Sequence, residues 1–160
     1  MTDKDMTVGI PMADDVLTPF PWQSTQWERI SGLLDAGKLP HALLLRGPAG
    51  TGKVHFAQAF AQRLLCAAPV AGIACGQCKY CKLFGANTHP DFFLVQPEDG
   101  SRSIKVEQVR DLITFASKKA QFEGYRVVLL HPAETMNVNS SNALLKCLEE
   151  PGANTLIMLV

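Results

Sequence analysis

Two patterns of apolar residues alternate along the chain. Four short segments are almost continuously apolar, which is typical of strands buried on both faces: residues 42–45, 92–95, 126–130 and 155–160. Between them, apolar residues recur at the spacing of helices: Trp27, Ile30, Leu33 and Leu34, then Ala57, Phe60, Ala61, Leu64 and Leu65, then Val106, Val109, Leu112, Ile113 and Ala116, then Leu144, Leu145 and Leu148. Strands that alternate with helices predict an α/β fold, with a parallel sheet flanked by helices.

The pattern also predicts the organisation of the chain. Residues 1–18 show neither a helical nor a strand period, and we expect them to form a flexible leader. Residues 19–160 then form one domain, which is a normal size for a single core. The sequence stops inside the last apolar segment, so we expect it to be a fragment whose sheet is truncated on its C-terminal side.

Composition narrows the class of protein. The 160 residues are 47% hydrophobic, with 15 acidic and 15 basic side chains. There is no excess of basic residues, which argues against a module that binds DNA by itself. No apolar run approaches the roughly 20 residues of a membrane span. The N-terminus lacks the apolar core of a signal peptide, and we therefore expect a cytoplasmic protein.

A glycine-rich stretch follows the first predicted strand and precedes a predicted helix. Residues 47–53 fit the phosphate-loop pattern G-x-x-x-x-G-K, which makes Gly47, Gly50, Thr51, Gly52 and Lys53 the candidate nucleotide-binding residues. Backbone N–H groups of such a loop bind phosphates at the helix N-terminus, and the lysine reaches the outer phosphates. The alternative is an ordinary strand-to-helix turn that carries the same residues.

The hydrolytic half of this site is missing. Val54 stands where the loop needs a hydroxyl for Mg²⁺, a cation that prefers oxygen ligands. After the third predicted strand, His131 and Pro132 stand where such ATPases carry two carboxylates. Glu134 is nearby but lies past the strand. We therefore predict that the chain has no catalytic residues. ATP or ADP can bind to this loop, but we expect no hydrolysis.

Four cysteines form a second candidate site. Cys66, Cys75, Cys78 and Cys81 have the spacing C-x8-C-x2-C-x2-C within a small insertion over about residues 66–85. Four thiolates at short spacing in a loop of small residues predict a structural Zn²⁺ site, with no position left for a reacting water. An iron–sulfur cluster would need another cysteine shortly after Cys81, and residues 82–85 supply none.

Two further residues are potential metal ligands by type. His89 is an alternative zinc ligand, although four cysteines already complete a tetrahedral set. Cys147 lies alone beside Leu144 and Leu148 on one face of a predicted helix. It is interpreted as a small core residue.

These motifs together resemble the bacterial clamp-loader ATPase-like family, which has the AAA+ (RecA-like) fold. The resemblance covers residues 21–160 and rests on Pro21-Trp22, on H-A-L-L at 41–44, on the four cysteines and on His89-Pro90-Asp91. It is most specific at residues 142–151, N-A-L-L-K-C-L-E-E-P, where Cys147 replaces the usual threonine.

The resemblance also implies a role. Two subunit types of that family carry such a zinc module: gamma/tau, an active ATPase, and delta-prime, whose phosphate loop is degenerate. Val54, His131 and Pro132 favour the second type. The resemblance implies a non-catalytic subunit of the DNA polymerase III holoenzyme, a DNA-directed DNA polymerase (nucleotidyltransferase). It would act as a stator beside gamma/tau and delta while the complex loads the sliding clamp onto primed DNA. The alternative is an active gamma/tau-type ATPase.

Overall fold

A computed structural model of the chain describes residues 16–160. Most of the predicted leader, residues 1–15, lies outside the described residues. Its last part is packed rather than free: Leu17 is buried in the core, and its N–H donates to the Oε1 atom of Gln62 over 2.9 Å. The domain therefore begins before Thr18, where the leader was expected to end.

Four parallel strands form the predicted sheet. They are β1 (Ala42–Leu44), β2 (Phe92–Val95), β3 (Arg126–Leu130) and β4 (Thr155–Leu159), in the order β1-β4-β3-β2. β3 pairs with β4 along its whole length, from Arg126 opposite Thr155 to Leu130 opposite Leu159. Because all strands run the same way, their C-terminal ends meet at one end of the sheet and their N-terminal ends at the other.

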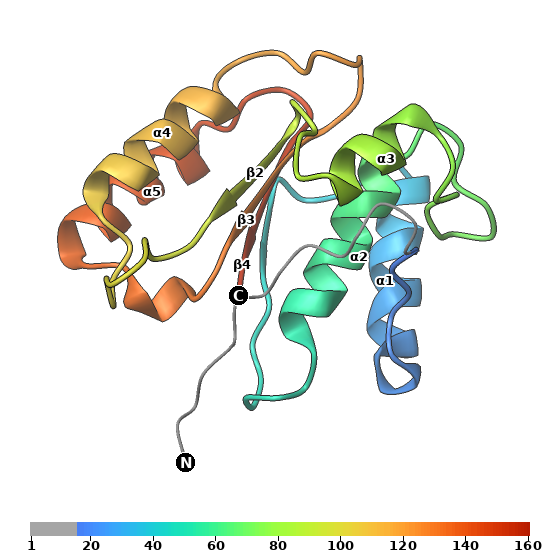
Figure 1. The fold of residues 1–160 in the computed structure, drawn as a ribbon, viewed down its shortest axis with the longest axis horizontal. Coiled ribbons are helices and arrows are strands. Elements are labelled where there is room, and N and C mark those ends of the chain that lie inside the picture. The colour runs from blue at the N-terminus through green and yellow to red at the C-terminus, as the bar shows by residue number, and fades with distance from the viewer. Residues whose placement is uncertain (1–15) are drawn as a thin grey trace.

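Helices cover both faces of the sheet, as Figure 1 shows. α1 (Ser24–Asp35), α2 (Lys53–Leu65) and α3 (Lys79–Gly85) lie on one face. α4 (Val106–Ala116) and α5 (Val138–Glu149) lie on the other, and two short 3-10 helices are η1 (Pro21–Gln23) and η2 (Ala133–Thr135). No helix within residues 16–160 combines the length and apolarity needed to cross a membrane.

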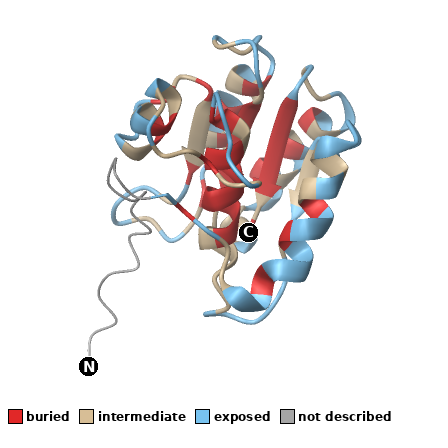
Figure 2. Ribbon diagram, turned by 90° about the vertical axis from the view of Figure 1, so that its right-hand side faces the viewer, coloured by how far each residue is buried: buried red, intermediate tan, exposed pale blue. Residues whose placement is uncertain are grey.

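The core has two halves because strand side chains alternate between the faces. In β3, Val127 and Leu129 pack with the α1–α2 layer, whereas Val128 and Leu130 pack with the α4–α5 layer. All of β3 is buried, which explains its nearly continuous apolar sequence. Figure 2 shows the same distribution, with buried residues on the strands and on the inner faces of the helices.

The N-terminal ends of β2 and β3 are joined by a buried ion pair. Asp91, 1% exposed, precedes β2, and its Oδ1 lies 3.4 Å from an Nη atom of Arg126, 4% exposed, at the start of β3. The carboxylate also accepts the N–H groups of Gln121 and Phe122, over 2.8 and 3.1 Å. The carboxylate is thus paired and hydrogen-bonded, which a buried charge requires.

Three local elements differ from the sequence-based expectation. A capping box at Thr25 and Glu28 is expected from the pattern, but α1 begins at Ser24, before Thr25, and no side chain caps it. The short α3 lies in a segment that shows no helical period because it is rich in small residues and cysteine. α5 begins at Val138 rather than near Ser140, with the Asn137 side chain accepting the Ser140 N–H over 2.8 Å.

Candidate phosphate loop and metal centre

The predicted phosphate loop lies at the C-terminal end of the sheet. It follows β1, and α2 begins at Lys53, as the sequence predicts. Within the described residues 16–160, the backbone N–H groups of Gly50, Thr51 and Gly52 have no hydrogen-bond partner in the protein. The loop therefore keeps the donors with which such a turn binds an anion.

The other side of the loop is held by the segment that precedes α1. Gln23, 8% exposed, donates its side-chain amide to the carbonyl oxygens of Thr51 and Gly52, over 3.0 Å in both cases. The indole N–H of Trp22 donates to the same Thr51 oxygen over 3.1 Å. The ring of Phe20 lies under Gly52, where an added Cβ would come within 2.6 Å of it. We call residues 20–23 the hook, because three of their side chains contact the backbone of the loop.

Lys53 is engaged within the loop itself. Its ammonium group donates to the carbonyl oxygen of Gly47 over 2.9 Å and to that of Pro48 over 2.7 Å. A phosphate would have to compete with these two oxygens for the lysine. The loop is therefore stable in this form through contacts that the chain supplies.

The end of β3 lies beside the loop and carries no acid. His131 and Pro132 follow the strand, and Glu134 is exposed in η2. Burial lowers the pKa of His131, and the nearby charge of Lys53 acts in the same direction, against a backbone hydrogen bond and the charge of Glu134. A neutral imidazole beside a lysine supplies neither a magnesium ligand of the required type nor a carboxylate base.

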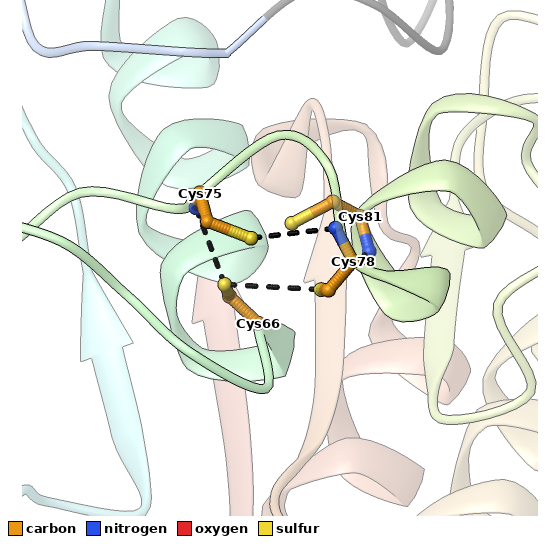
Figure 3. Close-up of side chains that lie close together, drawn as sticks. All are labelled: Cys66, Cys75, Cys78 and Cys81. Carbon is orange, nitrogen blue, oxygen red and sulfur yellow. Dashed lines mark hydrogen bonds between the residues drawn. The ribbon is translucent and has the colours of Figure 1, made fainter.

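The four predicted cysteines come together at the opposite end of α2. Cys66 follows α2, Cys75 and Cys78 lie in the loop that leads to α3, and Cys81 lies in the first turn of α3. Their sulfur atoms all lie within 4.8 Å of one another (Figure 3). Three backbone N–H groups point at these sulfurs: that of Cys75 at Cys66, that of Cys78 at Cys75, and that of Cys81 at Cys78.

The thiols differ in how readily they ionise. Hydrogen bonds from backbone N–H groups, that of Gln77 first, lower the pKa of Cys75 to about 6. Burial acts against the thiolate at Cys78, but backbone N–H groups outweigh it and lower the pKa. Burial raises the pKa of Cys66, and burial together with the neighbouring Cys78 thiol raises that of Cys81. A dication at the centre would favour all four thiolates.

The donor set fits a structural metal. In a tetrahedral zinc–thiolate site the sulfurs lie about 3.8 Å apart, since each Zn–S bond is about 2.3 Å. The cysteine cluster is looser than this by at most about 1 Å, a distance that side-chain torsions can close. All five cysteines of the chain are free thiols, so no disulfide competes for these sulfurs. Zn²⁺ bound here would cross-link the end of α2 to the start of α3 and supply no reaction.

The two other potential ligands, His89 and Cys147, lie elsewhere. His89 is outside the cluster, with its Nδ1 accepting the N–H of Asp91 over 3.1 Å. Cys147 is buried in the core between the sheet and α5, as the sequence predicts. Sequence reasoning missed the hook as a functional contact, because Gln23 and Thr51 are 28 residues apart and no pattern links them.

Comparisons with known proteins agree with this architecture. A family model described as "DNA polymerase III, delta subunit" matches residues 22–160. The protein named DNA polymerase III subunit delta' of Pseudomonas aeruginosa is 50% identical over 141 residues, which is 88% of this chain and 42% of that protein. The subunit delta' of Escherichia coli is 35% identical over 140 residues, with the same coverage. The chain thus spans less than half the length of the curated relatives it matches.

Two other matches concern the fold and the alternative assignment to a gamma/tau-type subunit. The crystal structure of a DNA polymerase III gamma subunit-related protein from Thermotoga maritima superposes with a TM-score of 0.62 at 19% identity. The superposition covers 84% of this chain and 38% of the Thermotoga maritima chain, and at this identity it supports only the fold. The subunit tau/gamma of Haemophilus influenzae is 36% identical over 121 residues, but these are only 17% of its length.

The parallel sheet, its covering helices and the loop after β1 define an α/β protein with the fold of the gamma subunit-related protein. Within that fold class, the chain belongs to the DNA polymerase III delta-subunit family whose curated relatives are named subunit delta'.

Proposed function

We propose that the chain is part of a non-catalytic clamp-loader subunit. In this role it is a rigid member of a complex with gamma/tau and delta subunits, which loads the sliding clamp onto primed DNA during replication in the cytoplasm. Any ATP or ADP that the loop holds is bound without hydrolysis. The match to relatives named subunit delta' supports the assignment to a complex of this kind.

One observation carries the non-catalytic part of this proposal. The chain carries no oxygen ligand at the two positions where such ATPases need one: Val54, the second residue of α2, packs its apolar side chain against the core, and His131 follows β3. Phosphoryl transfer depends on positioned Mg²⁺ and on a group that orients the attacking water. Lys53 is held by two loop carbonyls. The loop therefore serves as a preserved turn between β1 and α2.

The test is ATP turnover by the full-length protein, alone and in complex with its partner subunits, with Lys53→Ala as the matched variant. Alone, the wild-type protein should show no turnover above that of Lys53→Ala. In the complex, the two should support the same turnover and the same clamp loading. Turnover by the isolated protein that disappears with Lys53→Ala would establish the active ATPase instead. Titration with labelled ATP, with and without Mg²⁺, then measures whether the loop holds nucleotide.

For the metal, we propose that Cys66, Cys75, Cys78 and Cys81 hold one structural Zn²⁺. The convergence of four free thiols, two of them with a lowered pKa, supports this ligand set. Metal analysis of the purified protein should find about one zinc per chain, lost when Cys75 and Cys78 are both replaced by alanine. Iron, or no metal in protein that also takes up no added Zn²⁺, would contradict the assignment.

A further inference from the structure

Tyr80 lies between two of the four cysteines and contacts a distant part of the chain. It follows Cys78 by two residues and precedes Cys81, in the first turn of α3. Its ring stacks on that of Phe122, with centroids 4.5 Å apart and planes at 24°. Phe122 belongs to the α4–β3 connection, residues 117–125. The short turn that carries two candidate metal ligands therefore also carries the contact to this connection.

A buried histidine completes the contact. His89, 6% exposed, meets the Tyr80 ring at 5.9 Å and the Phe122 ring at 5.5 Å, edge to face in both cases. Its Nδ1 accepts the N–H of Asp91, so its proton lies on Nε2, which has no hydrogen-bond partner within the described residues. The edge-to-face contacts with the two rings contribute modestly to stability. The ammonium of Lys79 adds a contact 5.6 Å above the Phe122 ring.

Apart from Tyr125, which packs against the core next to β3, the connection has few other anchors. Its backbone is held by the N–H groups of Gln121 and Phe122, both of which donate to the carboxylate of Asp91. Most of its other side chains are exposed, including Lys118, Lys119 and Glu123. Segments with exposed side chains and few buried contacts open at low free energy. The stack of Tyr80 on Phe122 therefore contributes to keeping the middle of the connection closed onto the sheet.

We propose that Tyr80 couples metal binding at the cysteine cluster to the order of the α4–β3 connection. A metal that binds Cys78 and Cys81 fixes the turn between them, and that turn sets the plane of the Tyr80 ring. Phe122 then stacks on a fixed surface, and its N–H stays on Asp91. Without metal, the turn and the ring gain freedom, and the connection opens more often. This coupling rests on the proposed metal site but concerns residues that bind no metal.

Amide hydrogen exchange of the full-length protein tests the coupling, with the metal content measured on every sample. Removing the metal with a chelator should speed exchange of the Gln121 and Phe122 amides by about tenfold or more, besides loosening the cysteine cluster itself. Re-adding Zn²⁺ should reverse the change. If the protein binds metal and these two amides exchange equally with and without it, the coupling is wrong while the metal site stands. If the protein binds no metal, both proposals fail.

Variants of Tyr80 locate the coupling. In metal-bound Tyr80→Leu, exchange at residues 121 and 122 should approach the rate of the stripped wild type, with little further change on stripping. Tyr80→Phe keeps the ring and should behave as the wild type. Phe20→Leu removes another aromatic stack, with Trp22 at 4.8 Å, and should leave the metal response intact. A wild-type response in metal-bound Tyr80→Leu would overturn the role of Tyr80. If Tyr80→Leu binds no metal, the coupling is judged from the wild type alone, by comparing exchange at residues 121 and 122 with and without metal.

Discussion

The side-chain amide of Gln23 donates to the main-chain oxygen of Thr51 over 3.0 Å and so joins the start of α1 to the phosphate loop. The same amide reaches Gly52, and its Oε1 accepts the N–H of Phe20 over 2.9 Å. One buried side chain thus makes three hydrogen bonds to the main chain. The hook thus holds the loop through its carbonyl oxygens, not through the N–H groups that an anion would use.

Replacing Gln23 with alanine should therefore destabilise the protein. The three main-chain groups lose their partner, and we expect a loss of about 1–3 kcal/mol in the free energy of unfolding. Urea denaturation of both proteins measures this. Gln26→Ala, an exposed change on α1, is the matched control and should alter stability by less than about 0.5 kcal/mol. Equal stability of the two variants would show that the hook does not hold the loop.

Gly52 cannot accept a side chain. Its φ is +80°, and a Cβ would lie 2.6 Å from the Phe20 ring, so Gly52→Ala should cost about 1–3 kcal/mol. Gly32→Ala is the control, because a Cβ there meets nothing within 4 Å and the residue lies inside α1. That change should stabilise the protein by about 0.5–1 kcal/mol. Thermal unfolding should separate the two variants in opposite directions from the wild type.

Metal removal should lower stability only where the cysteine cluster is intact. A chelator should reduce the Tm of the wild type and leave that of the Cys75→Ala/Cys78→Ala variant unchanged, because binding to the folded state alone is what stabilises it. Cys147→Ala, in the core of the α4–α5 layer, should keep its metal and its response to the chelator. Loss of zinc from Cys147→Ala in a folded protein would contradict the assignment of the four ligands.

Replacing Asp91 in the buried ion pair should destabilise the protein more than replacing Arg126. Asp91→Ala leaves the Arg126 guanidinium with the Phe115 carbonyl and ring, and should cost about 3–5 kcal/mol. Arg126→Met should cost less, because the Asp91 carboxylate keeps two backbone N–H donors. Urea denaturation of the singles and the double variant completes a mutant cycle. Strictly additive losses would show that the two side chains do not interact.

Acid should destabilise the protein partly through His131. Burial lowers the pKa of this histidine in the folded state, so the unfolded chain binds more protons below the usual value of about 6.5. Stability therefore rises with pH, from the folded-state pKa up to about 6.5. The difference in free energy of unfolding between about pH 7.5 and pH 5.5 should be smaller in His131→Gln than in the wild type. An unchanged difference would contradict this contribution.

Sequence patterns predicted the parts of the molecule that depend on local order. The four strands and the helices with a clear apolar period were confirmed, with β2 and β3 at the expected residues. The cysteine spacing predicted correctly that Cys66 would meet the other three, because a short insertion leaves little freedom. The spacing alone does not test which metal binds, and the zinc assignment stays a proposal.

What the sequence did not predict depends on contacts between distant residues. Tyr80 and Phe122 are 42 positions apart along the chain, and neither lies in a pattern that indicates stacking. The missed α3 has only seven residues, fewer than a helical period needs to stand out. The capping box predicted at Thr25 was wrong because the 3-10 helix that begins at Pro21 leads directly into α1 at Ser24. The side chain next to this start, Gln23, accepts the N–H of Phe20 instead.

α2 begins in the phosphate loop and ends next to Cys66, so it separates the hook from the cysteine cluster by about 20 Å, the length of 13 helical residues. At this distance, and without shared partners, changes at the two sites should contribute independently. A protein that combines Gln23→Ala with Cys75→Ala should lose the sum of the two single effects. Each end of the helix can thus vary in sequence without constraining the other.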